Sequence, residues 1–165
     1  MGRCHAAFRN TNRRESIVGT LASDLFFIPG DVGGGNDRFE GRGSDDVASG
    51  GEGDDRLYGN EGRDTFYRGA GDDRLWGEEG DDQLWNAGAG RLCGVAGIDR
   101  LFVPAGGPGS LIQGGDGDDT LTANGAGLRL FGRSAALTRL PVQRGGPGCA
   151  ALRWTLRGGR ASCRP

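Results

Sequence analysis

The chain has 165 residues, of which 35 are glycine, and its formal net charge is −2. That length suits one domain, and no apolar run reaches the roughly 18 residues that a membrane-spanning helix needs. The charge is unevenly distributed, because residues 31–85 carry sixteen acids and six Arg, whereas residues 120–165 carry eight Arg and no acid. The acidic segment favours a multivalent cation as ligand and argues against nucleic acid as a partner.

The N-terminal segment 1–18 lacks the apolar run of a secretory signal, so export would require a leaderless route. We expect this segment to be a flexible arm. It contains His5, the single histidine of the chain, and a single histidine is too few for most zinc sites. A nine-residue pattern begins at residue 19, where the unit 19–27 has Asp24 at its sixth place.

Residues 32–85 form six consecutive nine-residue units without an insertion. The fourth place is Gly in five of the six units, with Ser44 as the exception. The eighth place is always apolar, at Phe39, Ala48, Leu57, Phe66, Leu75 and Leu84. The sixth place is always aspartate, at Asp37, Asp46, Asp55, Asp64, Asp73 and Asp82. Matches at three fixed places in unbroken register identify an internal repeat.

Downstream of this block the pattern decays. The unit 86–93 is one residue short and has no aspartate, and we expect Cys93 to take its apolar eighth place as a small hydrophobic residue. The next unit regains Asp99 at its sixth place. An eleven-residue stretch follows, and the unit 114–122 then matches in full and contributes Asp119.

These units resemble the RTX, or haemolysin-type calcium-binding, nonapeptide G-G-x-G-x-D-x-U-x. Residues 50–58 and 114–122 match it at every specified place. The resemblance implies an all-β fold, a parallel β-roll solenoid in which two units form one coil of about eighteen residues. We therefore expect three regions: a flexible N-terminal arm (1–18), an RTX β-roll (19–131, with the regular block 32–85) and an Arg-rich, disordered tail (132–165).

In such a roll the first six places of a unit are turns that leave backbone carbonyls facing one side, and the last three places form a short strand. Units two apart then stack, which makes neighbours of sixth-place carboxylates eighteen residues apart. The regular block contains four complete pairs: Asp37 with Asp55, Asp46 with Asp64, Asp55 with Asp73, and Asp64 with Asp82.

Two carboxylates together with loop carbonyls supply the hard oxygen ligands that Ca²⁺ prefers. Asp82 with Asp99 is a fifth candidate pair, at a separation of 17 residues. Asp119 has Leu101 eighteen residues before it, so it has no aspartate partner at that spacing. The predicted calcium ligands are Asp37, Asp46, Asp55, Asp64, Asp73, Asp82, Asp99 and Asp119.

Two further sets of side chains are expected to face outward. The fifth-place acids are expected to strengthen the negative field without binding metal: Asp45, Asp54, Asp72, Asp81 and Asp118. Ninth-place aromatic residues place Tyr58 with Trp76 on one sheet and Tyr67 with Trp85 on the other. These rings either stack in ladders along the sheets or pack under the terminal segments, and the alternative is a surface for a glycan or protein partner.

The sequence contains no nucleophile elbow, P-loop or HExxH motif, and we expect a protein that is not an enzyme. The function that the resemblance implies is calcium ion binding coupled to folding, in an extracellular protein secreted by a leaderless route. Two alternatives stay open. The chain could be the repeat fragment of a larger secreted RTX toxin or hydrolase, or an adhesin or surface-binding module that acts through its aromatic faces.

Overall fold

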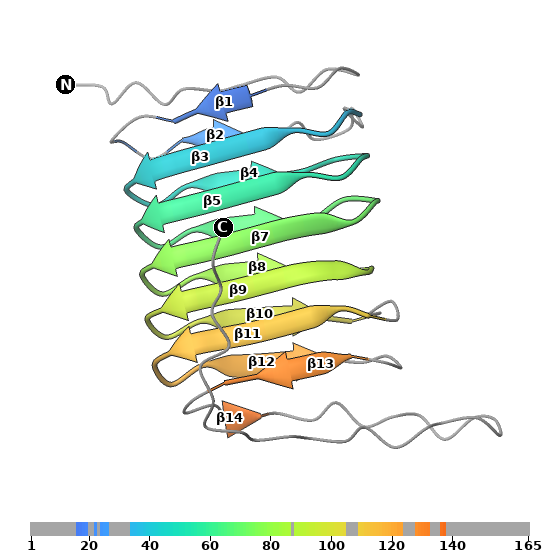
Figure 1. Ribbon diagram of the computed structural model, residues 1–165. Helices are drawn as coiled ribbons and strands as arrows, with labels where there is room; N and C mark the ends of the chain where they lie inside the picture. The colour runs from blue at the N-terminus through green and yellow to red at the C-terminus, as the bar shows by residue number, and fades with distance from the viewer. Residues whose placement is uncertain are drawn as a thin grey trace, which may run out of the picture.

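The computed structural model describes residues 16–19, 22, 24–26, 34–86, 88–104, 109–123, 128–132 and 136–137. These residues form two seven-stranded sheets in which every strand pairs in parallel with its neighbours. The strands of each sheet stack in chain order, as Figure 1 shows. The described residues include no helix that is long and apolar enough to cross a membrane. The all-β parallel β-roll expected from the sequence is confirmed.

The chain alternates between the two sheets, so that the odd-numbered strands form one sheet and the even-numbered strands the other. The odd-strand sheet consists of β1 (Ser16–Val18), β3 (Arg38–Gly43), β5 (Arg56–Glu61), β7 (Asp73–Glu79), β9 (Gly90–Ala96), β11 (Leu111–Asp116) and β13 (Arg129–Phe131). The even-strand sheet consists of β2 (Leu25–Phe26), β4 (Val47–Ser49), β6 (Thr65–Tyr67), β8 (Gln83–Trp85), β10 (Arg100–Val103), β12 (Thr120–Ala123) and β14 (Ala136–Leu137).

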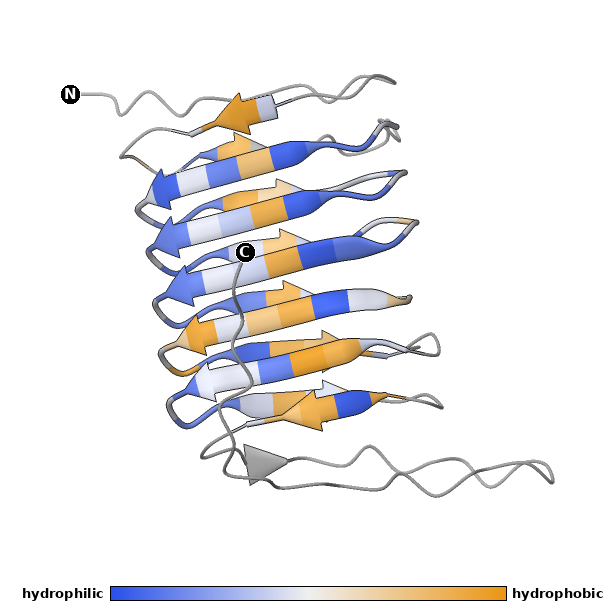
Figure 2. Ribbon diagram, in the orientation of Figure 1, coloured by the Kyte–Doolittle hydropathy of each residue, from blue (hydrophilic) through white to orange (hydrophobic). Residues whose placement is uncertain are grey.

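The eighth-place side chains fill the space between the sheets. All six of the regular block are 0 % exposed, as predicted. The buried core consists of Phe39, Ala48, Leu57, Phe66, Leu75, Leu84, Leu92, Leu101, Val103, Ile112 and Leu121. Figure 2 shows hydrophobic positions that recur at the same place along successive strands. Because burial of each such side chain stabilises the fold by about 1.5–3 kcal/mol, the core fixes the register of one coil on the next.

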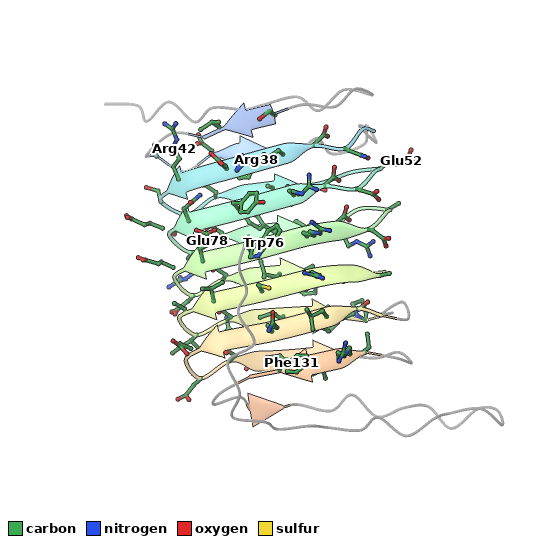
Figure 3. The ribbon with its side chains drawn as sticks, viewed as in Figure 1. Arg38, Arg42, Glu52, Trp76, Glu78 and Phe131 are labelled. Atoms are coloured by element: carbon green, nitrogen blue, oxygen red, sulfur yellow. The ribbon has the colours of Figure 1, made fainter. Side chains whose placement is uncertain are left out.

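Strands of the odd-strand sheet are longer than the sequence analysis predicts. β5 and β7 continue through the first three places of the following unit, because Asn60 pairs with Glu78 and Glu61 with Glu79. Second-place residues there have positive φ, at Arg42, Asn60, Glu78 and Val95. Figure 3 shows Arg42 and Glu78 on the same edge of the roll, opposite Glu52.

The unit 86–93 has eight residues and not nine, and the missing residue belongs to the loop and not to the strand. Arg91 pairs with Arg74 and Leu92 with Leu75, so Leu92 is the buried eighth-place residue. The expectation that Cys93 takes this place is wrong. A shift of the strand by one residue would turn Arg91 into the core, and Cys93 instead lies beside Trp76 on the outer face.

Ring ladders run along both sheets, as one of the two sequence interpretations predicts. Tyr58 and Trp76 stack with their centroids 4.6 Å apart and their planes 3° apart, and both are buried. Tyr67 and Trp85 stack at 6.2 Å, and Trp85 meets Phe102 at 4.7 Å. Tyr67 and Trp85 are 40 % and 38 % exposed, so only the even-strand sheet has its aromatic ladder open to solvent.

Most residues of the predicted arm 1–18 and tail 132–165 lie outside the described residues. Within these two segments, Ser16–Val18 forms β1 and pairs with β3, and Ala136–Leu137 forms β14 and pairs with β12. The sheets therefore extend beyond the range 19–131 at both ends.

Candidate metal sites

The sixth-place aspartates form two ladders, one along each edge of the roll. The long ladder lies where the chain turns from the odd-strand into the even-strand sheet, and consists of Asp24, Asp46, Asp64, Asp82, Asp99 and Asp119. The short ladder lies on the opposite edge and consists of Asp37, Asp55 and Asp73. Every one of these residues is at most 3 % exposed. Each edge of the roll therefore holds a buried row of carboxylates.

One oxygen of each carboxylate connects neighbouring coils. In both ladders Oδ1 accepts the backbone N–H of the aspartate one coil earlier, at distances between 2.6 Å for Asp46 and 3.1 Å for Asp119. All four predicted pairs of the regular block are brought together in this way, and so are Asp82 and Asp99. The hydrogen bond fixes the carboxylate plane and leaves Oδ2 for another partner.

The second oxygen has no hydrogen-bond donor within the described part of the chain at six positions: Asp46, Asp55, Asp64, Asp82, Asp99 and Asp119. A buried polar atom without a partner costs about 1–3 kcal/mol, and more when it is charged. The same arrangement in six places therefore points to a ligand that the carboxylates share.

Each Oδ2 lies in a cradle beside the first-place glycine of its own unit. A Cβ placed on Gly41 would lie 2.2 Å from Asp46 Oδ2 and 2.6 Å from the carbonyl oxygen of Gly59 on the next coil. On Gly59 it would lie 2.0 Å from Asp64 Oδ2 and 2.5 Å from the carbonyl oxygen of Gly77. A carboxylate oxygen and a carbonyl oxygen of the next coil thus converge on one point, which only glycine leaves open.

Burial raises the pKa of these carboxyls above the ordinary aspartate value. Desolvation is the largest cause, and neighbouring carboxylates add to it. It raises the pKa of Asp64 to about 8 and those of Asp55 and Asp99 to about 7. For Asp46 and Asp82 the pKa rises to about 6. A raised pKa means that burial disfavours the ionised form of these carboxylates.

Asp119 has a ladder partner at a spacing other than eighteen residues. Its Oδ1 accepts the N–H of Asp99, twenty residues earlier, at 3.1 Å. The stretch between units 94–102 and 114–122 contains a further strand, β11, in which Ile112 pairs with Leu92. This coil completes the stack and absorbs two additional residues. Its signal in the sequence is the apolar Leu111–Ile112 followed by Gly114–Gly115.

Asp24 is a ladder residue that the set of predicted ligands omits. It lies 22 residues before Asp46, and its N–H donates to Asp46 Oδ1 at 2.6 Å. The sign of this ladder residue in the sequence is the aspartate at the sixth place of the unit 19–27. The long ladder therefore begins before the regular block.

Fifth-place acids lie outside the ladders and are exposed, as predicted. They also connect the coils, which the sequence analysis missed. Asp45 Oδ1 accepts the N–H of Arg63, and Asp54 Oδ1 accepts the N–H of Asp72, each at 2.9 Å and eighteen residues apart. A side-chain acceptor that pairs with a fixed backbone donor holds the loops of adjacent coils together.

Among the described residues, no three carboxylate, imidazole or thiolate side chains gather in one place. A metal bound at the ladders would therefore depend on backbone carbonyls as well as on aspartates. Such a donor set, all oxygen, suits a hard cation such as Ca²⁺ and not a soft one. The fold and the ladders together define a parallel β-roll with buried acidic turns suited to cations.

Comparison with known proteins agrees with this class. The family model of the RTX calcium-binding nonapeptide repeat, in four copies, matches residues 31–66, 69–90 and 106–126. The chain therefore carries RTX calcium-binding nonapeptide repeats, and the resemblance seen in the sequence is confirmed. No curated protein and no solved structure gives a significant match.

Proposed function

We propose that the chain binds Ca²⁺ between consecutive coils and that this binding is coupled to folding. The observation that carries the proposal is the set of six buried Oδ2 atoms without a donor in the described residues, each beside a first-place glycine. The proposed ligands are backbone carbonyls of the loops together with Asp24, Asp37, Asp46, Asp55, Asp64, Asp82, Asp99 and Asp119. Asp73, the remaining predicted ligand, already has a cationic partner in Arg68. The role is binding and not catalysis.

Coupling to folding follows from the cost of the ladders without metal. Ordering the backbone costs about 1–2 kcal/mol per residue, and the core contributes only about one buried side chain for every nine residues. Buried carboxylates add desolvation to this cost, which their raised pKa values reflect. A cation that binds only the folded chain offsets these terms, as structural metals do in other small domains.

The test is a titration of the whole chain with Ca²⁺ from EDTA, followed by far-UV circular dichroism and repeated with Mg²⁺. We expect a cooperative change from coil to β structure with Ca²⁺ at roughly 0.1–1 mM, the range of extracellular calcium modules. Mg²⁺ demands a tighter octahedron and keeps its water, so it should substitute poorly. A β spectrum that is the same in EDTA, Mg²⁺ and Ca²⁺ would overturn the proposal.

We also propose that the protein acts outside the cell. The weak calcium affinity that we expect supports this, because such a chain stays unfolded at low calcium and folds where calcium reaches the millimolar range. Secretion of a tagged chain into the medium, followed by protease resistance that depends on calcium, is the expected result. Retention of a calcium-free, protease-resistant chain inside the cell would contradict it.

Glycan binding is the second candidate function, and the exposure of the aromatic rings favours the outer face of the even-strand sheet for it. Trp76 is only 5 % exposed, whereas Tyr67 and Trp85 present stacked rings to solvent. Aromatic rings of this kind can stack on sugar rings. Loss of polysaccharide binding in Trp85→Ala with unchanged calcium binding would support an adhesin, and no binding by the wild-type chain would exclude it.

A further inference from the structure

Arg68 occupies a place that four of the other five units of the regular block give to glycine. It is the first residue of the unit 68–76, and the first place is Gly at Gly41, Gly50, Gly59 and Gly77. The Arg68 side chain runs into the edge of the roll, where it is only 2 % exposed. A buried Arg requires compensating partners, because its guanidinium stays protonated.

Two acceptors supply that compensation. Arg68 Nε donates to Asp73 Oδ2 at 2.6 Å, and Nη1 donates to Asn86 Oδ1 at 2.7 Å. Asp73 belongs to the same unit as Arg68, whereas Asn86 is the first residue of the next unit on this edge. The guanidinium therefore connects two consecutive coils through charge-assisted hydrogen bonds.

The hydrogen bond from Arg68 Nε gives Asp73 Oδ2 a donor of a kind that Oδ2 of six other ladder carboxylates lacks within the described part of the chain. At Asp46, Asp55 and Asp64 the corresponding Oδ2 lies beside a glycine and has no donor in the described residues. The guanidinium also packs against the next unit on this edge, since a Cβ on Gly88 would lie only 2.2 Å from Arg68 Nη1. Both oxygens of Asp73 therefore have donors, the Asp55 N–H on Oδ1 and Arg68 Nε on Oδ2.

The position of Arg68 along the short ladder gives this contact its role. Asp73 is the last carboxylate of the ladder, because the following coil presents Gly90 opposite Asp73. The unit 86–93 has no aspartate that could complete a pair. A fixed positive charge is therefore present at the end of the short ladder, where the next coil supplies no negative charge.

We propose that the Arg68 guanidinium takes the place of a calcium ion at Asp73, so that this position is closed to metal and connects its two coils without it. The inference rests on the proposed calcium function. It distinguishes Asp73 from the other predicted ligands. It also predicts one contact between coils that survives removal of calcium.

The test compares Arg68→Gly with Arg68→Lys and with Arg63→Gly, which removes an exposed Arg. Equilibrium dialysis measures the number of calcium ions per chain, and circular dichroism measures the β signal in EDTA and in saturating calcium. Arg68→Gly restores the glycine cradle, so we expect one additional ion per chain. We also expect a weaker β signal in EDTA and a larger gain of β signal on adding calcium than in the wild-type chain.

The two other variants should bind the wild-type number of ions, because Arg68→Lys keeps a cation at Asp73 and Arg63 is exposed. An unchanged ion number in Arg68→Gly, or an additional ion in Arg68→Lys, would overturn the proposal. The same holds if calcium fails to restore the fold of Arg68→Gly. A wild-type chain that binds no calcium would instead refute the proposed function.

Discussion

Each ladder carboxylate uses its two oxygens for different purposes. Asp64 Oδ1 accepts the N–H of Asp46 at 2.8 Å, whereas Oδ2 faces Gly59 and the carbonyl oxygen of Gly77. An asparagine at this position would keep the first contact and direct an amide N–H toward the carbonyl. It would also remove the negative charge that a calcium ligand needs.

The substitution Asp64→Asn should therefore have opposite effects in the two metal states. At pH 9, where the carboxyl with its pKa of about 8 is ionised, we expect a stronger β signal than wild type in EDTA and a lower melting temperature in calcium. Calcium affinity should fall at least tenfold. Asp45→Asn is the matched control, because it removes an exposed charge and keeps the acceptor for Arg63. Equal shifts in the two variants would show that Asp64 is not a ligand.

Backbone strain at a second-place residue predicts that a substitution by glycine stabilises the fold. Glu78 has a φ of 80° and a pKa that is raised by burial and by neighbouring Glu40 and Glu79. A left-handed φ costs a non-glycine residue about 1–2 kcal/mol in the folded state. Glycine avoids this cost, but it loses up to about 1 kcal/mol because its unfolded chain has more conformational entropy. Glu78→Gly should therefore raise the melting temperature in calcium by roughly 2–6 °C. Glu79→Gly, at ordinary φ, should lower it, and the reverse order would contradict the strain argument.

At the scale of the strand and loop, fourth-place glycines determine how closely the coils stack. A Cβ on Gly80 would lie 1.6 Å from the carbonyl oxygen of Gly62 one coil earlier, and one on Gly62 would lie 2.2 Å from that of Ser44. No rotation of a side chain relieves such a contact, because both partners are backbone. The loops must separate, and the oxygens of the adjoining ladder separate with them.

We therefore expect Gly80→Ala to abolish the cooperative calcium-induced transition in circular dichroism. Gly109→Ala is the control, since Gly109 also has positive φ, at 89°, but a Cβ added there would meet no described atom within 4 Å. The control should lose only the roughly 1–2 kcal/mol of a strained φ and keep the transition. If both variants behave alike, φ and not close stacking explains the regular spacing of the glycines within this chain.

The spacing of the ladder aspartates shows which parts of the fold could be predicted from the sequence. Within 32–85 no insertion interrupts the units, so the core and the pairs eighteen residues apart follow directly. Outside that block the pairs are 17, 20 and 22 residues apart, because loops change length while burial fixes the strands. The inward turn of Arg68 could not be predicted, since it depends on Asp73 and Asn86 meeting across two coils.

At the scale of the whole molecule, protons and calcium compete for the same carboxylates. Burial raises the pKa of Asp55 and Asp99 to about 7 and that of Asp64 to about 8, from 3.8. Without metal the folded roll thus holds protons that the unfolded chain releases. The stability that these carboxyls contribute to the metal-free roll is fully present below about pH 4 and is lost as pH rises through about 8. With calcium bound, the same groups must be ionised, so protons weaken the metal complex.

The pH dependence of stability should therefore change sign with calcium. Between pH 5 and pH 9 in EDTA, we expect the β signal to fall, because raised carboxyl pKa values favour the protonated folded state. In saturating calcium the melting temperature should rise over the same range. Circular dichroism spectra in EDTA and melts in calcium, each at four pH values, measure the two slopes. Slopes of equal sign would show that the buried carboxylates neither hold protons in the metal-free roll nor give them up to calcium.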